Sequence, residues 1–195
     1  MKDVLTHTDA LILIVDDSAT NLQVLGSILR EHKYSTAVAE NGEEALAFVA
    51  KRRPQLILLD IAMPGLDGFE VCTRLKQTPE YNSIPVIFLS VRTESSEKVR
   101  AFQCGGVDYI TKPFQREEIV ARIEVHLQLQ QAKQMLQAAN EALEQRVRER
   151  TSELMASNAK LEEANIALRV LLEQKDESKG ILQETMGSNL KQSIM

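Results

Sequence analysis

The chain has few of the residues that build disulfides, metal sites or membrane anchors. Only two cysteines occur among 195 residues, Cys72 and Cys104, and their wide separation predicts reduced thiols rather than a disulfide framework or a zinc site. The longest apolar run near the start, Leu11 to Val15, is too short for a signal peptide or a membrane span. A net charge of -5 argues against a broad basic surface for nucleic acid. We therefore expect a cytoplasmic protein that makes no direct contact with nucleic acid or membrane.

Turn-forming residues are missing from the C-terminal part of the chain. All five prolines and all eight aromatic residues lie at or before Phe114, and no glycine occurs between Gly106 and Gly180. A stretch without these residues lacks the usual punctuation of turns. The sequence therefore predicts a short tail over residues 1–8, a compact domain over 9–125 and a continuous helix after it.

Five short apolar runs in the first part predict strands, with amphipathic segments of helical spacing between them. The runs at Leu11–Val15 and Leu56–Leu59 do not alternate with polar residues, so they suit strands that are buried on both faces. Alternating strands and helices favour a doubly wound α/β domain with a parallel sheet. The expected strands are Leu11–Val15, Ser35–Ala39, Gln55–Leu59, Ile84–Leu89 and Val107–Ile110.

A heptad register runs from His126 to Leu182 and predicts a coiled coil. Ten of its seventeen a and d positions are apolar, and a narrow apolar seam repeated by sevens indicates two helices wound together. A lone helix folded against its own domain is the alternative, but it would outrun a domain of this size. Asn140 at an a position favours a parallel dimer over residues 126–182. Residues 183–195 would be a tail or the start of a missing output domain.

Polar residues follow the predicted strands, at the edge where ligands bind in parallel α/β sheets. Asp16 and Asp17 follow the first strand, Asp60 the third, Ser90 the fourth and Lys112 the fifth. Three carboxylates at one place repel one another unless a cation lies among them, and Mg²⁺ prefers such oxygen ligands. Taken singly, Asp17 or Ser18 would be a helix cap, and Lys112 with the proline after it a loop. The combination favours a functional site.

These residues resemble the receiver domain of two-component response regulators. The resemblance rests on Asp16-Asp17, Ser90, Lys112-Pro113-Phe114, and Asp60 with the Met63-Pro64-Gly65 and Asp67-Gly68 that follow it. It implies a flavodoxin-like, five-stranded parallel sheet of order 2-1-3-4-5, followed here by the long helix. The segment from Leu143 to Leu168, with Arg148-Glu149-Arg150-Thr151 inside it, also resembles signalling helices that join such domains to downstream enzymes.

The resemblance implies a role for each residue of the site. Asp60 would accept a phosphoryl group from a sensor histidine kinase or a histidine phosphotransfer protein. Asp16, Asp17, Asp60 and the backbone carbonyl of Ala62 would hold Mg²⁺. The resemblance further implies that Lys112 and Ser90 stabilise the phosphoryl group, that Ser90 and Tyr109 form the switch, and that the bond before Pro113 is cis. Such a domain catalyses only its own phosphorylation and dephosphorylation, so it is not an enzyme in the usual sense.

One residue beside the site departs from the family pattern. Val91 stands where the family usually has Ala or Gly, and a larger side chain there would narrow access to Asp60.

Several alternative functions remain at this point. A phosphatase of the haloacid dehalogenase type would need a second Asp two residues after Asp60, where Ala62 stands. A transcription factor would need a DNA-binding motif that does not follow the receiver. The chain would relay its switch through the coiled coil to an output domain, or act as a stand-alone dimeric receiver, or serve as a constitutive dimerisation module. His126 lacks the sequence context of a kinase phosphoacceptor and is expected to be a polar seam residue.

Overall fold

The structure, a computed structural model, describes residues 10–91 and 95–192, so the tail predicted over residues 1–8 lies outside the described part. Contacts divide the chain into two units, Met1–Met135 and Leu136–Met195. Strands and helices alternate through the first unit, and its last helix continues into the second. In order, the elements are β1 (Leu11–Val15), α1 (Ala19–Glu31), β2 (Ser35–Ala39), α2 (Gly42–Lys51), β3 (Leu56–Asp60), α3 (Gly68–Gln77), β4 (Val86–Ser90), α4 (Ser95–Gln103), β5 (Asp108–Thr111) and α5 (Arg116–Gln192).

The five strands form one parallel sheet in the order β2-β1-β3-β4-β5, which confirms the predicted fold class. Every residue of β1, β3 and β4 is buried. The edge strands β2 and β5 are partly exposed. The unbroken apolar runs therefore mark the strands with neighbours on both sides and helices on both faces, as expected for parallel sheets.

The last three strands begin and end slightly later than their apolar runs predict. β3 and β4 extend to Asp60 and Ser90, because the ladder continues through these polar residues to pair Asp60 with Leu89 and Ser90 with Thr111. At the other end, Ile84 and Pro85 precede β4, since the Ile84 amide donates to the Tyr81 carbonyl in a turn and proline has no amide proton. Hydropathy detects the buried part of each strand and misses its polar last residue.

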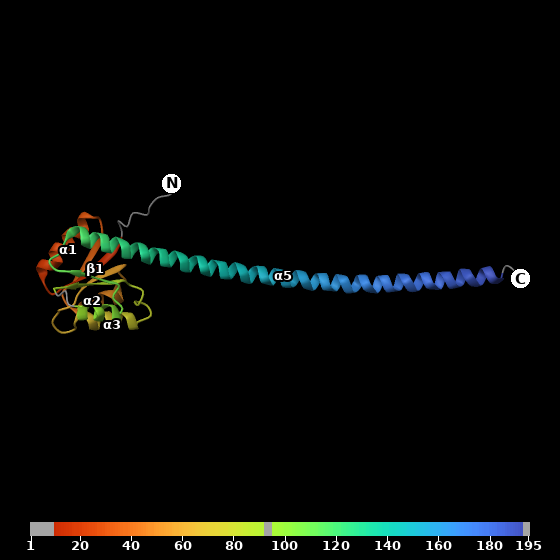
Figure 1. The fold of residues 1–195 in the computed structure, drawn as a ribbon, viewed down its shortest axis with the longest axis horizontal. Helices are drawn as coiled ribbons and strands as arrows, with labels where there is room; N and C mark the ends of the chain where they lie inside the picture. The colour runs from red at the N-terminus through yellow and green to blue at the C-terminus, as the bar shows by residue number, and fades with distance from the viewer. Residues whose placement is uncertain (1–9, 92–94, 193–195) are drawn as a thin grey trace. The chain divides into compact units, whose positions relative to one another are not determined.

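Helices cover both faces of the sheet, with α1 on one face and α2 and α3 on the other (Figure 1). The side chains of β1 alternate between two cores. Leu13 and Val15 pack with α2, α3 and Ala101 of α4. Ile12 and Ile14 pack with α1 and the first part of α5. The sheet is thus held from both sides, which fixes the positions of the strand ends that carry the polar residues.

The helices that follow β2 and β3 begin with local capping bonds. Asn41 caps α2 by accepting a hydrogen bond from the Glu44 amide. Asp67 and Glu70 form a reciprocal capping box at the start of α3. Ser18 occupies the N-cap position of α1, but its side chain makes no capping bond. The capping role considered for Ser18 is therefore wrong, and the start of α1 is bonded to Asp16 instead.

The first turns of α5 belong to the core of the domain. Ile119, Val120 and Ile123 are buried against the sheet, as the helical spacing predicts, and Leu127 is buried as well. No helix of the described part of the chain is both long and apolar enough to cross a bilayer.

Beyond the domain, the apolar a and d positions of α5 between Leu136 and Leu171 are exposed in the single chain. Between 56% and 64% of each side chain is accessible at Leu136, Leu143, Val147, Leu154, Leu161, Leu168 and Leu171. A regular stripe of exposed leucines is costly in water and suits burial against another helix. The continuous α5 is consistent with the predicted coiled coil.

Candidate functional site

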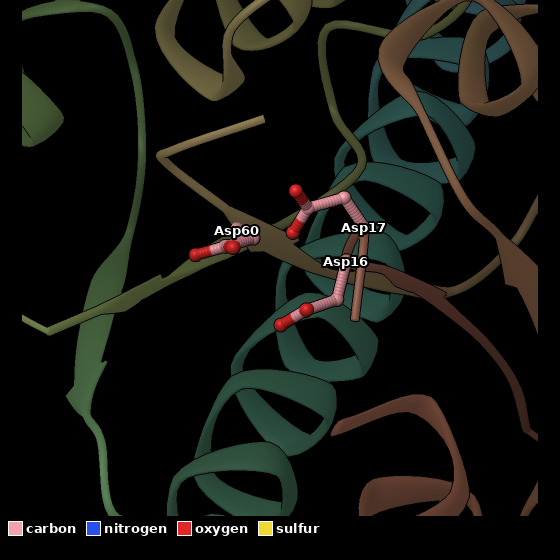
Figure 2. Close-up of side chains that lie close together, drawn as sticks. All are labelled: Asp16, Asp17 and Asp60. Carbon is pink, nitrogen blue, oxygen red and sulfur yellow. The ribbon is translucent and has the colours of Figure 1, made fainter. Parts of the chain in front are cut away.

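The carboxyl edge of the sheet brings the predicted polar residues together. Asp16 and Asp17 follow β1, Asp60 ends the neighbouring β3, and Figure 2 shows their three side chains close to one another. One carboxylate oxygen from each lies within 4.8 Å of the others. Ser90 ends β4 and Lys112 follows β5 on the same edge. Residues separated by almost a hundred positions in sequence thus form one cluster, because parallel strands all end on the same side.

Asp60 has one free oxygen at the centre of this cluster. The residue is only 3% exposed, and its Oδ2 lies 3.0 Å from the Lys112 ammonium. Its Oδ1 is buried without a hydrogen-bond partner among the described residues. Burial raises the pKa of Asp60 despite the opposing effect of Lys112. A buried carboxylate oxygen without a partner is costly, so it indicates a place for a ligand.

Lys112 lies between two carboxylates. Its Nζ is 2.8 Å from Oδ2 of Asp16 as well as 3.0 Å from Oδ2 of Asp60. Burial lowers the pKa of Lys112, but the hydrogen bonds to both carboxylates outweigh that effect and raise it above its ordinary value. Lys112 therefore stays positively charged. The peptide bond between Lys112 and Pro113 is cis, as the resemblance implies.

Asp16 is completely buried and held from several directions. In addition to Lys112, it accepts hydrogen bonds from the Ser18 amide at 2.9 Å and from the Asn21 side-chain amide at 2.9 and 3.0 Å. Its neighbour Asp17 is exposed. One carboxylate is thus rigid and the other accessible from solvent.

The donor set fits a hard divalent cation. Asp16, Asp17 and Asp60 supply three carboxylates, whereas Lys112 supplies a single positive charge inside the cluster. The unpartnered Oδ1 of Asp60 adds a ligand atom that nothing else in the described chain uses. Oxygen ligands and excess negative charge are what Mg²⁺ binds in proteins. Asp16, Asp17, Asp60 and the carbonyl of the exposed Ala62, two residues after Asp60, are the residues that would hold it.

Ser90 and Val91 line a cavity that leads to Asp60. The cavity has a volume of about 330 Å³, and its other walls are Ile61, Ala62 and Glu97. Ser90 is 6% exposed and its hydroxyl donates to Oε2 of Glu97 at 3.2 Å. Val91 is 70% exposed. Its side chain, larger than the Ala or Gly that is usual in the family, therefore lies at the mouth of this cavity rather than within it.

Tyr109, the second predicted switch residue, is half-buried on β5 among cations. The Lys98 ammonium lies 4.4 Å from its ring centroid, and the Arg122 guanidinium 5.9 Å. Phe102 of α4 meets the ring edge-on at a centroid distance of 6.3 Å. The ring is therefore in contact with both α4 and α5, the two helices beside β5.

Asp108, next to Tyr109, joins β5 to α5. It pairs with Arg122 at 2.8 Å and with Nε2 of His126 at 3.0 Å. Burial raises the pKa of Asp108, but hydrogen bonds from His126 and Arg122 outweigh it and lower the pKa below its usual value. His126 thus faces its own domain, so the interpretation of it as a polar seam residue is wrong for the described chain. Strand propensity and heptad spacing gave no signal for this contact.

The two cysteines are free, as predicted, although the fold brings them together. The Cys72 thiol of α3 donates to the Cys104 carbonyl at 3.4 Å. Burial and the neighbouring Cys104 raise the pKa of Cys72 to about 12. The thiol is therefore neutral and unreactive at ordinary pH.

Three residues of the site were missed by sequence reasoning. Asn21 lies in the first turn of α1 and donates to Asp16, Glu97 lies in α4 and accepts from Ser90, and Asp108 pairs with Arg122 of α5. Only Asn21 had a usable signal in the sequence. The connection between β1 and α1 is short, so a polar side chain five positions after Asp16 can return to it. The other two depend on how helices pack against the sheet.

The chain is similar in sequence to known proteins. Residues 12–124 match the response regulator receiver domain family. A "Probable cyclic di-GMP phosphodiesterase" of Vibrio cholerae is 37% identical over 143 residues, covering 73% of this chain and 32% of that protein. "DNA-binding response regulator MtrA" of Mycobacterium tuberculosis is 38% identical over 116 residues, covering 60% of this chain and 50% of that protein. The chain thus spans a third to a half of the length of these relatives.

A solved structure agrees with the sequence match. The crystal structure of a putative response regulator from Chloroflexus aurantiacus has a TM-score of 0.60 and 35% identity with this chain. The match covers 61% of this chain and 98% of the solved one. The match with the solved structure thus leaves more than a third of this chain outside it.

Proposed function

Because this chain belongs to the response regulator receiver domain family over residues 12–124, we propose that it takes a phosphoryl group onto Asp60. The donor would be a phosphohistidine of a sensor histidine kinase or of a histidine phosphotransfer protein. The observation that carries the proposal is the unpartnered, buried Oδ1 of Asp60 beside Asp16, Asp17 and Lys112. This oxygen would be the nucleophile, with an open position in front of it and with positive and negative side chains around it.

The transfer step uses the two oxygens of Asp60 differently. Oδ1 would attack the phosphorus of the donor phosphohistidine, forming the new P–O bond, while the P–N bond breaks and its electron pair remains on the donor imidazole. Oδ2 stays paired with Lys112 at 3.0 Å, which holds the plane of the carboxylate in place. Little covalent chemistry is needed from other residues, so positioning and charge would account for the rate.

Charge on the transferred group would be stabilised by residues already at the edge. The Lys112 ammonium would pair with phosphoryl oxygens, and the Ser90 hydroxyl would donate to one of them. Bound Mg²⁺ would neutralise part of the phosphoryl charge and align its oxygens. Asp16, Asp17, Asp60 and the Ala62 carbonyl would be its ligands. Tyr109 would then follow Ser90 as the switch.

The switched state would pass to α5. Tyr109 contacts Arg122, and Asp108 pairs with Arg122 and His126, so β5 and the base of α5 are directly connected. The exposed seam from Leu136 to Leu171 supports a parallel homodimer in which the two helices pair. A shift at β5 would change that pairing, and the coiled coil would carry the change to an output domain. The Vibrio cholerae relative, named as a phosphodiesterase, supports an enzyme as that output.

Two further proposals concern the cellular compartment of the protein and its binding to nucleic acid. We place the protein in the cytoplasm, where both free thiols stay reduced. We propose no direct contact between this chain and nucleic acid, since its net charge of -5 argues against a broad basic surface.

Replacing Asp60 by asparagine is expected to abolish phosphorylation. With Mg²⁺ and a small donor such as phosphoramidate, the wild type should gain one phosphoryl group, which intact mass spectrometry detects and peptide mapping assigns to Asp60. The Asp60→Asn variant lacks the nucleophilic oxygen and should gain none. Asp67→Asn is the matched control, because asparagine also caps α3, and it should be phosphorylated like the wild type. Phosphorylation of Asp60→Asn at the wild-type rate would contradict the proposal.

A further inference from the structure

A glutamate on α4 holds the hydroxyl of Ser90. Glu97 is the third residue of α4, and its Oε2 accepts a hydrogen bond from the Ser90 hydroxyl at 3.2 Å. Ser90 itself is only 6% exposed, so this hydrogen bond is partly shielded from water. The bond joins the end of a central strand to a helix on the face of the sheet.

Glu97 also faces the place where a phosphoryl group would stand. The cavity of about 330 Å³ that reaches Asp60 also has Glu97, Ser90 and Val91 in its lining. A phosphoryl group carries about two negative charges at neutral pH. It would therefore enter a cavity with an anionic carboxylate in its wall and would need the same hydroxyl that Glu97 now holds.

A second, smaller cavity lies beside the Ser90–Glu97 contact. It lies between Ser90, Glu97 and Tyr109, and has a volume of about 10 Å³. That is about the space of one water molecule, so it cannot take an aromatic ring. An inward turn of the Tyr109 ring therefore needs the residues that line this cavity to move apart, and Ser90 and Glu97 are two of them.

We propose that Glu97 is a positioning residue that keeps the receiver in its unphosphorylated state by competing with the phosphoryl group for the Ser90 hydroxyl. This inference rests on the proposed function of Asp60. Phosphorylation breaks the contact in two ways, because the phosphoryl oxygens take the hydroxyl and their charge repels the carboxylate. The first turn of α4 is then released and Tyr109 gains room. Glu97 thus sets the free-energy difference between the two states.

A purely structural role for Glu97 makes a different prediction. An acidic residue in the first turn of a helix is stabilising because it faces the positive end of the helix dipole. If that were its whole role, neutralising Glu97 would lower the stability of α4 and leave the affinity for a phosphoryl mimic unchanged.

The test compares Glu97→Gln, Glu97→Ala and the wild type in the full chain. The affinity for beryllofluoride, which mimics a phosphoryl group on a carboxylate, is measured by calorimetry at saturating Mg²⁺. Removal of the competing charge and acceptor should tighten binding by about threefold to tenfold. Glu44→Gln is the matched control, because it neutralises the third residue of α2 and should leave the affinity unchanged.

Hydrogen exchange provides a second readout that does not depend on the mimic. In the wild type, beryllofluoride should accelerate amide exchange in the first turn of α4. In Glu97→Ala, exchange there should already be fast without it. Equal affinity and equal α4 exchange in wild type and both variants would overturn the inference alone, provided that wild type binds and Asp60→Asn does not. Failure of the wild type to bind would overturn the proposed function and this inference with it.

Discussion

Replacing Lys112 by methionine is expected to slow phosphorylation of Asp60 by about 100-fold, the usual effect of removing one preorganised charge from a phosphoryl or oxyanion site. Methionine keeps the length and much of the volume of the side chain but not its charge. Lys112 is the one cation that contacts both Asp16 and Asp60 in the described chain, at 2.8 and 3.0 Å. Its loss removes this positive charge from beside the transferred group and leaves the two buried carboxylates of Asp16 and Asp60 without their shared cation.

The rate is measured with a small phosphodonor at saturating Mg²⁺. Lys112→Arg should rescue only part of the rate, because the planar guanidinium does not reproduce a point charge in this narrow space. Lys51→Met, which removes an exposed cation from the last turn of α2, should phosphorylate at the wild-type rate. A folded Lys112→Met variant that reacts as fast as Lys51→Met would show that the ammonium has no part in the transfer.

The second large effect is expected at Gly68, which supports the backbone of the phosphoacceptor. A Cβ at this position would lie 2.2 Å from the carbonyl oxygen of Asp60 and 3.0 Å from its carbonyl carbon. The Gly68 amide also donates to the Ile61 carbonyl at 3.0 Å. Since backbone atoms cannot give way as a flexible side chain does, Gly68→Ala should lower the free energy of unfolding by about 2–4 kcal/mol.

Urea unfolding of Gly68→Ala beside Gly26→Ala measures this effect. Gly26 lies in the middle of α1, where an added Cβ meets only the end of the Arg30 side chain, at 3.3 Å. Because alanine is the better helix former, Gly26→Ala should be neutral or more stable by up to about 1 kcal/mol. Gly68→Ala should also lose phosphorylation rate, since the Asp60 backbone must shift. Equal unfolding midpoints for the two variants would refute the steric account.

The architecture could be predicted from the sequence because its signals are local. The parallel sheet was predicted from the unbroken apolar runs at β1 and β3 and from the amphipathic segments between strands. The order of the strands was predicted from the resemblance to receiver domains. The carboxylates that follow the strands could be predicted to lie together, because the carboxyl ends of parallel strands lie at one edge of the sheet. The strand ends at Asp60 and Ser90 were missed because a polar residue can continue a backbone ladder without adding hydropathy.

The contacts that connect the site to the helices could not be predicted. Glu97 reaches Ser90 only because the first turn of α4 lies beside the last residue of β4, and Asp108 reaches His126 only because α5 passes the first residue of β5. Both depend on helix packing rather than on spacing along the chain. The heptad pattern even assigned His126 to the seam, since a periodic count does not show where a helix leaves its own domain.

The most direct test of the account is sedimentation equilibrium on the full chain with Mg²⁺, in the presence and absence of beryllofluoride. We expect a dimer whose dissociation constant changes when beryllofluoride is added, and an Asp60→Asn variant whose dissociation constant does not respond. This result would connect the charge at Asp60 to the pairing of α5. A wild-type dimer that is indifferent to beryllofluoride would contradict the relay and would make the coiled coil a fixed scaffold.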